Sequence, residues 1–369
     1  MGKLRVLVLF GGRSGEHEVS LSSATSIMEG LLACKTFEVI PVGITREGDW
    51  LYGSDPLLTL KSGDLPGGNV RVAILPFPAS GGLYILEGEE KGKTIEVDVV
   101  FPVLHGTFGE DGTVQGLLEL AGIPYVGAGV LGSAAGMDKI IMKAVLKEGG
   151  LPVGEYIWFT VTDWIKDKER IMQDVEEKLG FPCFIKPANL GSSVGISKAY
   201  DNTGLSKGIS EAGRYDNRIL VERYLSGREI ECSILGNESP EASVLGEVIP
   251  CNDFYDYRAK YLDEQSRIVI PSTLSNEVAD RVREMSIKTF SLLDCAGFAR
   301  VDCFVDDKSG SIYVNEINTI PGFTSISMFP KLWEESGLSF TSLLTRLINL
   351  ALERFASKGR LETVLKLDV

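Results

Sequence analysis

The sequence predicts an α/β unit at the amino terminus, followed by two α+β units. Three observations support this class. Apolar strand-like runs alternate with helical patterns in the first part of the chain, strand-rich segments with flanking helices follow, and 369 residues are enough for two or three domains. We expect the units to cover residues 1–126, 127–226 and 227–369.

The first unit opens with an apolar strand, Leu4–Phe10, a helix, Leu21–Ala33, and a second strand, Phe37–Ile44. A further strand, Val97–Leu104, and a short helix, Thr113–Ala121, complete the pattern. Because apolar strands joined by helices are typical of parallel sheets, we expect a parallel sheet that is covered on both faces.

The segment from Trp50 to Lys93 is rich in glycine and proline, which predicts irregular additions and hairpins on the first unit. Within it, Gly88–Thr94 resembles a Walker A phosphate loop. The loop is one residue short, however, and a strand pattern follows where a helix is needed. We therefore interpret Gly88–Thr94 as a hairpin turn.

The other two units combine strands with flanking helices. In the second unit we expect helix Asp138–Lys147, strand Glu155–Phe159, helix Asp163–Leu179, and strands Pro182–Pro187, Val194–Lys198 and Arg218–Tyr224. In the third we expect strands Glu229–Leu235 and Val244–Ile249, a polar segment Pro250–Pro271, helix Asn276–Cys295, strands Phe298–Val305 and Ser311–Asn318, and helix Phe340–Phe355.

Composition limits the function classes. With 37 Lys and Arg against 51 Asp and Glu, the net charge is −14, which disfavours binding to nucleic acids and to anionic membranes but allows a single nucleotide. The six cysteines form no CxxC pair, and two histidines cannot form HExxH. Because no apolar run reaches eighteen residues, we expect no membrane span and a cytoplasmic enzyme.

Two glycine-rich loops invite familiar interpretations. Gly11–Gly15 follows a strand but lacks the GxGxxG pattern, so NAD binding is disfavoured and an anion or substrate loop remains. Gly191–Gly195 matches the GxSxG pattern of α/β-hydrolases. Those enzymes need a histidine after the serine, whereas His17 and His105 both precede Ser193. A hydrolase triad is therefore disfavoured.

The strongest chemical signal lies near the carboxyl terminus. Arg300 and Asp302 are two residues apart on one expected strand, and Glu316 and Asn318 are two apart on the next. A hairpin about the turn Asp306–Gly310 brings Asp302 near Glu316 on one face. Facing carboxylates repel each other unless a cation lies between them, and these hard oxygen ligands suit Mg²⁺. The alternative is a solvated polar face.

Lys186 ends an otherwise buried strand, and the loop 189–195 after it exposes backbone N–H groups to an anion. We interpret the loop 189–195 as a hairpin flap that covers phosphates, with Lys186 beside it. The alternative is that Lys186 extends to solvent and binds no ligand. The segment 222–229 could offer its main chain to an adenine edge and a carboxylate to ribose hydroxyls. Alternatively, Glu222 and Glu229 are surface charges.

Several motifs that occur together in one known enzyme family follow one another here in the same order, over nearly the whole chain. They are Gly11–Ser20, His105–Gly112, Met137–Lys139, Ile185–Pro187, Gly191–Gly195, Tyr255–Tyr261, Arg300–Asp302 and Asn315–Gly322. On these motifs the chain resembles the D-alanine–D-alanine ligase family of the ATP-grasp superfamily. The resemblance implies an ATP-grasp fold with an N-terminal Rossmann-like parallel-sheet domain, a small central α+β domain and a C-terminal α+β domain.

The resemblance also assigns nucleotide and metal ligands. ATP would be bound by a set of residues in the middle of the chain: Lys139, Lys186, Ser193, Glu222, Arg223, Leu225 and Glu229. Of these, the two lysines would hold the phosphates, Glu222 and the main chain of Arg223 and Leu225 the adenine, and Glu229 the ribose. Two Mg²⁺ ions, with Mn²⁺ as a substitute, would be held by Asp302, Glu316 and Asn318.

For the substrates, the resemblance implies that Glu16 takes the ammonium of the first D-alanine with His105 beside it. Ser327 would hold the carboxylate of the second D-alanine, and Met328 would line its subsite, where leucine is common in relatives. Arg300 and the N–H of Gly322 would stabilise the tetrahedral oxyanion.

Residues 250–271 would form an Ω loop that is expected to be the lid of the site. A hydrogen-bonded triad of Glu16, Ser192 and Tyr261 would position this loop. Lys260 from that loop would reach the γ-phosphate. The resemblance associates tyrosine at position 261 with D-alanine as the acceptor.

The implied reaction is ATP-dependent ligation of two D-alanines through a D-alanyl phosphate, for synthesis of peptidoglycan precursors. Two alternatives remain open: a D-alanine–D-lactate or D-alanine–D-serine ligase of the same fold, and a nucleotide-binding regulator without catalysis, which would be expected to lack a metal ligand or Arg300. A homodimer is a family expectation only.

Overall fold

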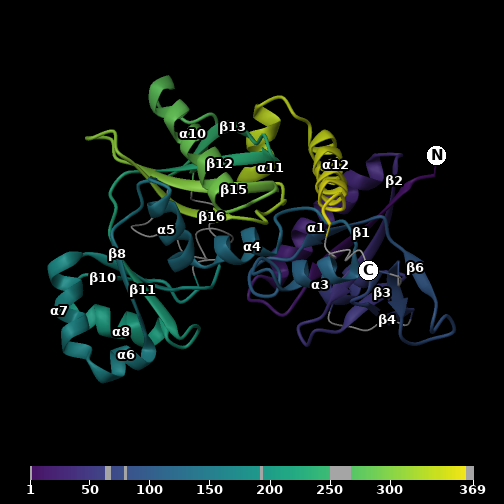
Figure 1. Ribbon diagram of the computed structural model, residues 1–369, viewed down its shortest axis with the longest axis horizontal. Coiled ribbons are helices and arrows are strands. Elements are labelled where there is room, and N and C mark those ends of the chain that lie inside the picture. Colours follow the sequence, from purple (N-terminus) through teal and green to yellow (C-terminus); the bar gives the residue numbers. More distant parts are fainter. Residues whose placement is uncertain (1, 63–67, 79–80, 192–193, 250–266, 363–369) are drawn as a thin grey trace, which may run out of the picture.

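The computed structural model describes residues 2–62, 68–78, 81–191, 194–249 and 267–362 of the chain. These residues form three sheets with helices packed around them (Figure 1). Four predicted site residues, Ser192, Ser193, Lys260 and Tyr261, lie outside the described residues, as does most of the expected lid.

The first sheet has the strand order β6-β5-β4-β3-β2-β1-β7. Its predicted parallel part is confirmed: β1 (Leu4–Gly11) pairs in parallel with β2 (Phe37–Ile44) and with β7 (Val99–Val103). The segment after β2 adds an antiparallel extension, so the whole sheet is mixed. The extension consists of β3 (Trp50–Gly53), α2 (Pro56–Ser62), β4 (Asn69–Ile74), β5 (Gly82–Ile85) and β6 (Thr94–Glu96).

The hairpin interpretation of Gly88–Thr94 is confirmed, because this segment connects the antiparallel strands β5 and β6. Its backbone closes the turn through hydrogen bonds from Gly92 N–H to the Ile85 carbonyl and from Ile85 N–H to the Lys93 carbonyl. No helix follows it that could present a phosphate site, so the Walker A likeness has no structural counterpart here.

The second sheet is wholly antiparallel, with the order β10-β9-β11-β8. Its strands are β8 (Tyr156–Thr160), β9 (Cys183–Pro187), β10 (Ser197–Ala199) and β11 (Arg218–Arg223). One face packs on three helices, α6 (Val161–Lys166), α7 (Lys168–Lys178) and α8 (Asn202–Ala212), around buried residues such as Ile185 and Val221. The other face carries Lys186 and Glu222, which are offset by one position from those core residues.

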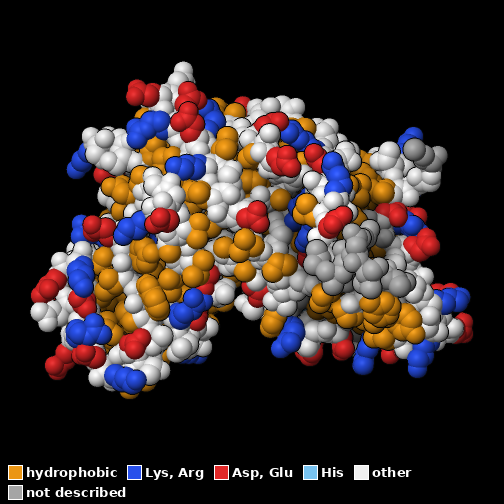
Figure 2. Space-filling model, in the orientation of Figure 1, with side chains coloured by type: hydrophobic (Ala, Val, Ile, Leu, Met, Phe, Trp, Pro, Cys, Tyr) orange, Lys and Arg blue, Asp and Glu red, His pale blue; other side chains and the backbone are white. Residues whose placement is uncertain are grey.

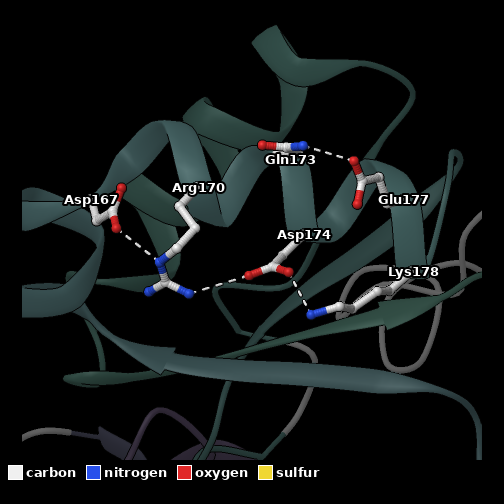
Figure 3. Close-up of polar contacts among 6 residues, drawn as sticks. All are labelled: Asp167, Arg170, Gln173, Asp174, Glu177 and Lys178. Carbon is white, nitrogen blue, oxygen red and sulfur yellow. Dashed lines mark hydrogen bonds and ion pairs between the residues drawn. The ribbon is translucent and has the colours of Figure 1, made fainter.

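The single helix predicted over Asp163–Leu179 is wrong. The chain forms two helices because α6 ends at Lys166 and Asp167, which has φ −146°, separates it from α7. A capping box between Thr160 and Asp163 starts α6. The exposed side of α7 carries a chain of ion pairs and hydrogen bonds between its charged and amide side chains (Figure 3).

The third sheet has the order β14-β13-β12-β15-β16. Its strands are β12 (Arg228–Gly236), β13 (Glu241–Ile249), β14 (Arg267–Val269), β15 (Gly297–Val305) and β16 (Ile312–Asn318). One face packs on α5 (Lys139–Glu148) and α10 (Asn276–Leu292). Part of the opposite face is covered by α11 (Met328–Glu335), a helix that the sequence analysis does not predict.

The first and third units share a core. The final helix, α12 (Phe340–Lys358), packs against α1 (His17–Ala33), and both helices belong to one buried cluster with β1, β7 and β15 (Figure 1). Two short helices, α3 (Thr113–Ala121) and α4 (Val130–Met137), follow β7. At the centre of the shared core, Phe323 makes edge contacts with Phe101 of β7 and Phe298 of β15, with ring centroids 6.1 and 5.7 Å apart. The segment after β16 is thereby fixed between the two units.

The surface view shows an indentation between the lobe with the four-stranded sheet and the lobe with the seven-stranded sheet (Figure 2). Acidic and basic side chains are interspersed over this face. No helix among the described residues is long and apolar enough to cross a membrane.

Candidate active site

The predicted acidic hairpin is confirmed. β15 and β16 pair antiparallel, Asp302 lies directly opposite Glu316, and Arg300 lies opposite Asn318. The Asp302 residue is 1% exposed, so the alternative of a solvated polar face is wrong for this carboxylate. The Nδ2 group of Asn318 donates a hydrogen bond of 3.1 Å to Asp302.

Arg300 compensates the buried acids. Its guanidinium donates to both carboxylate oxygens of Asp302, at 2.7 and 2.6 Å, and pairs with Glu231 of β12 at 2.9 Å. Burial alone would lower the pKa of Arg300, but the charges of Asp302 and Glu231 outweigh it and hold the pKa well above the ordinary value. The sequence analysis does not single out Glu231, although its position two residues after Glu229 places both on the same strand face.

The donor set fits a magnesium site. Among the described residues, no group of three or more His, Cys, Asp or Glu side chains could hold a metal ion alone. The hairpin instead offers two facing carboxylates, Asp302 and Glu316, with the Asn318 amide beside them. Such a set leaves positions for phosphate oxygens, which is how Mg²⁺ is usually bound with nucleotides.

The second charged cluster lies on the second sheet and α5. Glu222 of β11 pairs with Lys186 of β9 and Lys143 of α5, each at 2.5 Å. Burial would raise the pKa of Glu222, but the two lysines outweigh burial and lower the pKa to about 2. Lys143 is missed by the sequence analysis; its only local signal is its position four residues after Lys139, on the same side of a helix.

Lys139 holds the backbone of the glycine-rich loop. Its Nζ donates to the Leu190 carbonyl at 2.6 Å, and its main-chain N–H donates to the Ala188 carbonyl at 2.9 Å. The side chain is buried. Lys139 and Lys186 therefore reach the same end of β9, one at the loop and the other at Glu222.

The expected adenine segment connects the second and third sheets at residues 224–227. The main-chain N–H of Arg223 donates to the Glu155 carbonyl at 2.9 Å, and its exposed guanidinium pairs with the Glu155 carboxylate. Leu225 packs beside Gly154. Glu229 is half-buried on β12, on the same face as Glu231.

Glu16 lies where three parts of the chain meet. It is buried at the start of α1, and a Cβ atom on Gly106 or on Gly191 would lie only 2.6 or 2.7 Å from its Oε2. Those two glycines belong to the β7–α3 loop and to the loop after β9, so the carboxylate is enclosed by both. Glu110, from the β7–α3 loop, is also buried; burial and the charge of Glu16 raise its pKa.

His105 is buried with both ring nitrogens engaged. Its Nδ1 lies 2.9 Å from the carbonyl of Ile320, and its Nε2 lies 3.2 Å from the hydroxyl of Ser23 on α1. Burial lowers the pKa of His105 to about 4, so the ring is neutral at neutral pH.

Three more predicted residues, Gly322, Ser327 and Met328, lie beyond Ile320. A Cβ atom on Gly322 would lie 2.8 Å from the hydroxyl of Ser327, which places these two residues side by side. The same hydroxyl accepts a hydrogen bond from the N–H of Thr324 at 3.0 Å. Met328 is buried in a small apolar cluster with Val248 and Leu332, against β13.

Two family models match the chain: "D-ala D-ala ligase N-terminus" over residues 5–128 and "D-ala D-ala ligase C-terminus" over residues 145–349. The chain belongs to the D-alanine–D-alanine ligase family. Within this family it is 53% identical to the ligase of Natranaerobius thermophilus, over 98% of this chain and 99% of the relative. It is 48% identical to the ligase of Acetivibrio thermocellus, over 96% and 97%.

Solved structures of the family agree with the fold. The D-alanine-D-alanine ligase from Coxiella burnetii superposes with a TM-score of 0.85 at 36% identity, covering 98% of this chain and 97% of that one. The VanG D-Ala:D-Ser ligase from Enterococcus faecalis gives a TM-score of 0.84 at 36% identity, covering 95% and 99%. The fold is accordingly the ATP-grasp fold that the motifs imply.

Proposed function

We propose that this chain joins two molecules of D-alanine into D-alanyl-D-alanine at the expense of ATP, for synthesis of peptidoglycan precursors. The observation that carries the proposal is the β15–β16 hairpin, which holds Asp302, Glu316 and Asn318 together beside Arg300 in a chain of the D-alanine–D-alanine ligase family. A regulator without catalysis would not need the complete set of charged groups.

The three sheets support three domains with the boundaries 1–126, 127–226 and 227–369, and ATP would bind between the last two. Lys139 and Lys186 would hold its phosphates, with Ser193 at the loop after β9. Glu222 and Glu229 would take the adenine and ribose, and the main chain at Arg223 and Leu225 would complete that contact. Because the Arg223 N–H already donates to Glu155, this residue would have to contribute through another main-chain group.

Asp302, Glu316 and Asn318 would hold two Mg²⁺ ions, which Mn²⁺ could replace. When bound, the metal offsets negative charge on the phosphates of the nucleotide. The chain itself supplies the rest of this wall: Arg300 orients the Asp302 carboxylate through two hydrogen bonds.

In the first step, the carboxylate of one D-alanine attacks the γ-phosphorus of ATP, which gives D-alanyl phosphate and ADP. Glu16 would hold the ammonium of that D-alanine in the pocket enclosed by Gly106 and Gly191. Lys260 would reach the transferred phosphoryl group. Residues 250–271 would form the lid, and a triad of Glu16, Ser192 and Tyr261 would hold it in place. A closed lid is needed because an acyl phosphate hydrolyses in water.

In the second step, the amine of the other D-alanine attacks the acyl carbon, and inorganic phosphate leaves. Arg300 and the Gly322 N–H would stabilise the oxyanion, while Ser327 and Met328 would form the acceptor subsite. D-serine is the second candidate acceptor, since the chain is similar to a D-Ala:D-Ser ligase over nearly its whole length. We also propose a cytoplasmic location and a homodimer, as expected for the family.

Phosphate release in the presence of ATP, Mg²⁺ and an amino acid tests the proposal. We expect turnover with D-alanine but not with L-alanine, and loss of nearly all turnover in Glu316→Ala, because one of the facing carboxylates is gone. The matched control is Glu89→Ala, which changes an exposed glutamate in the β5–β6 turn and should leave the rate unchanged. Offering D-serine or D-lactate as the acceptor with D-alanine separates the related ligases. Full turnover in Glu316→Ala would refute the metal assignment.

A further inference from the structure

The segment after β16 is held by the first unit at three points. The N–H of Ile320 donates to Glu110 at 3.2 Å, the Ile320 carbonyl lies 2.9 Å from His105 Nδ1, and the N–H of Phe323 donates to the Ser23 hydroxyl at 3.2 Å. All three partners are buried and belong to α1 or to the β7–α3 loop. Gly322, whose N–H is the proposed oxyanion donor, lies between the two anchored residues.

The direction of these hydrogen bonds follows from their chemistry. The Ile320 carbonyl can only accept, so His105 Nδ1 carries the proton and donates it. Because the ring is neutral, Nε2 has no proton and must accept from the Ser23 hydroxyl. The Ser23 oxygen is left to accept from the Phe323 N–H. The hydrogen bonds thus run in one direction, from Phe323 through Ser23 and His105 back to Ile320.

This arrangement uses every polar atom of the His105 ring within the protein. The two ring nitrogens therefore serve the protein's own hydrogen bonds, whether or not the first D-alanine lies beside the ring as the family resemblance implies. The backbone carbonyl of His105 accepts a hydrogen bond from the Ser14 hydroxyl at 2.7 Å, and that hydroxyl accepts one from the N–H of Glu16 at 2.9 Å. The same loop thus fixes both the proposed ammonium pocket and the segment that carries Gly322.

We propose that Ser23 is a positioning residue for the second step of the reaction: with His105 and Glu110 it fixes the segment 320–323 so that the Gly322 N–H points at the oxyanion. The inference rests on the proposed function, because it assigns a cause to the proposed role of Gly322. Ser23 touches no reacting atom in this assignment; it acts through the main chain of Phe323.

Ser23→Ala tests the proposal with a change of one atom in a buried site. Without the hydroxyl, the Phe323 N–H loses its acceptor and His105 Nε2 its donor, and the oxyanion donor loses one of its anchors. Removing an oxyanion donor outright costs about 10²- to 10³-fold in rate, so we expect about a 10-fold loss of dipeptide formation from this partial release. The first step should keep its rate.

Two rates measured on the same enzyme separate the steps. Movement of labelled oxygen between the bridging and non-bridging positions of ATP reports reversible formation of the acyl phosphate, and dipeptide formation reports the second step. We expect the ratio of exchange to dipeptide to rise about 10-fold in Ser23→Ala. A merely structural loss would lower both rates together and leave the ratio unchanged.

The matched control is Ser286→Ala, which removes a fully buried serine hydroxyl that donates to its own helix at Val282. Its ratio should equal that of the wild type. Glu110→Gln provides an independent variant, because it replaces one of the two side-chain oxygens that accept from the N–H groups of Gly106 and Ile320 with an amide nitrogen, which cannot accept. We expect the same rise in the ratio.

The outcomes separate the two proposals. Failure of the wild-type chain to make dipeptide would overturn the proposed function. Normal dipeptide synthesis by the wild type, with ratios in Ser23→Ala and Glu110→Gln within twofold of it, would overturn the positioning role alone.

Discussion

Lys143→Met should destabilise the fold far more than loss of an ordinary lysine. The Lys143 side chain is 2% exposed and its Nζ lies 2.5 Å from Glu222, which is itself 7% exposed. Methionine keeps the length and apolar stem of the lysine but removes its charge. Within the described part of the chain, Lys186 is then the remaining cationic partner of Glu222.

The magnitude follows from the pKa of Glu222, which falls from 4.5 to about 2 despite burial. At about 1.4 kcal/mol per pKa unit, the two lysines favour the ionised carboxylate by about 3 kcal/mol beyond its burial cost. Removal of one partner from a buried ion pair costs about 3–5 kcal/mol. Since one cation remains, we expect Lys143→Met to lower the free energy of unfolding by about 3 kcal/mol.

Urea unfolding at neutral pH measures this loss, and Lys178→Met is the matched control. Lys178 also forms an ion pair, with Asp174 on α7, but it is 58% exposed (Figure 3). Exposed pairs of this kind contribute at most about 0.5 kcal/mol. A loss in Lys143→Met no larger than that of the control would refute the reasoning.

Acidification and a second substitution test the same cluster. Because the pKa of Glu222 is lowered in the folded state, its contribution is present above about pH 4.5 and is lost as the pH falls towards 2. In Lys143→Met the pKa of Glu222 should rise towards its ordinary value, so the acid-dependent loss of stability should be smaller and should be complete at higher pH. Adding Glu222→Gln to Lys143→Met should recover part of the lost stability, since the buried carboxylate that has lost one of its two cations is then replaced by a neutral amide.

Two further predictions concern Glu16 and His105, which both belong to the first unit. Gly191→Ala places a Cβ atom 2.7 Å from Glu16 Oε2. We expect the KM for D-alanine, measured from initial rates, to rise about 10-fold, with little change in the free energy of unfolding. An unchanged KM would show that Glu16 does not contact the substrate there. The pKa of His105 is lowered from 6.5 to about 4, so the unfolded chain binds the extra proton and stability present above pH 6.5 is lost as the pH falls towards 4. Between pH 7 and 5 the loss should be about 2 kcal/mol in urea unfolding, and His105→Gln should lack that component.

The acidic hairpin shows why part of the site could be predicted from the sequence. Residues two apart on a strand share a face, and a short polar turn sets which strands pair. One detail goes beyond this rule: Val314 lies in the core while Glu316 faces the site, although both are even-numbered positions. A β-bulge makes this possible, because the register shifts between Asp302 and Cys303.

The contacts that the sequence did not predict share a different property, since they join residues that are distant in the sequence. Ser23 and Phe323 are 300 positions apart, and His105 and Ile320 are 215 apart. No local sequence pattern around Ser23 or Glu110 predicts these contacts. They form because α1 and the β7–α3 loop share a core with the segment after β16. The role of Lys143 also depends on a distant partner, Glu222, and a lysine on an amphipathic helix is usually predicted to be exposed.

The two clusters of charge form the two walls of the proposed nucleotide site, and we infer from their charges that the ligand contacts both. On the second sheet and α5, the two lysines Lys143 and Lys186 surround the single carboxylate of Glu222, so this wall offers cationic groups. On the third sheet, Glu231 and Asp302 share Arg300, and Glu316 lies opposite Asp302, so that wall offers carboxylates. Charges of one sign that are gathered on a wall favour ligand groups of the opposite sign. A polyphosphate that carries divalent cations satisfies both walls at once, because its oxygens suit the lysines and its metal ions suit the carboxylates. A bare anion would satisfy only the first wall and a bare cation only the second, so each should bind weakly alone and each should strengthen the binding of the other.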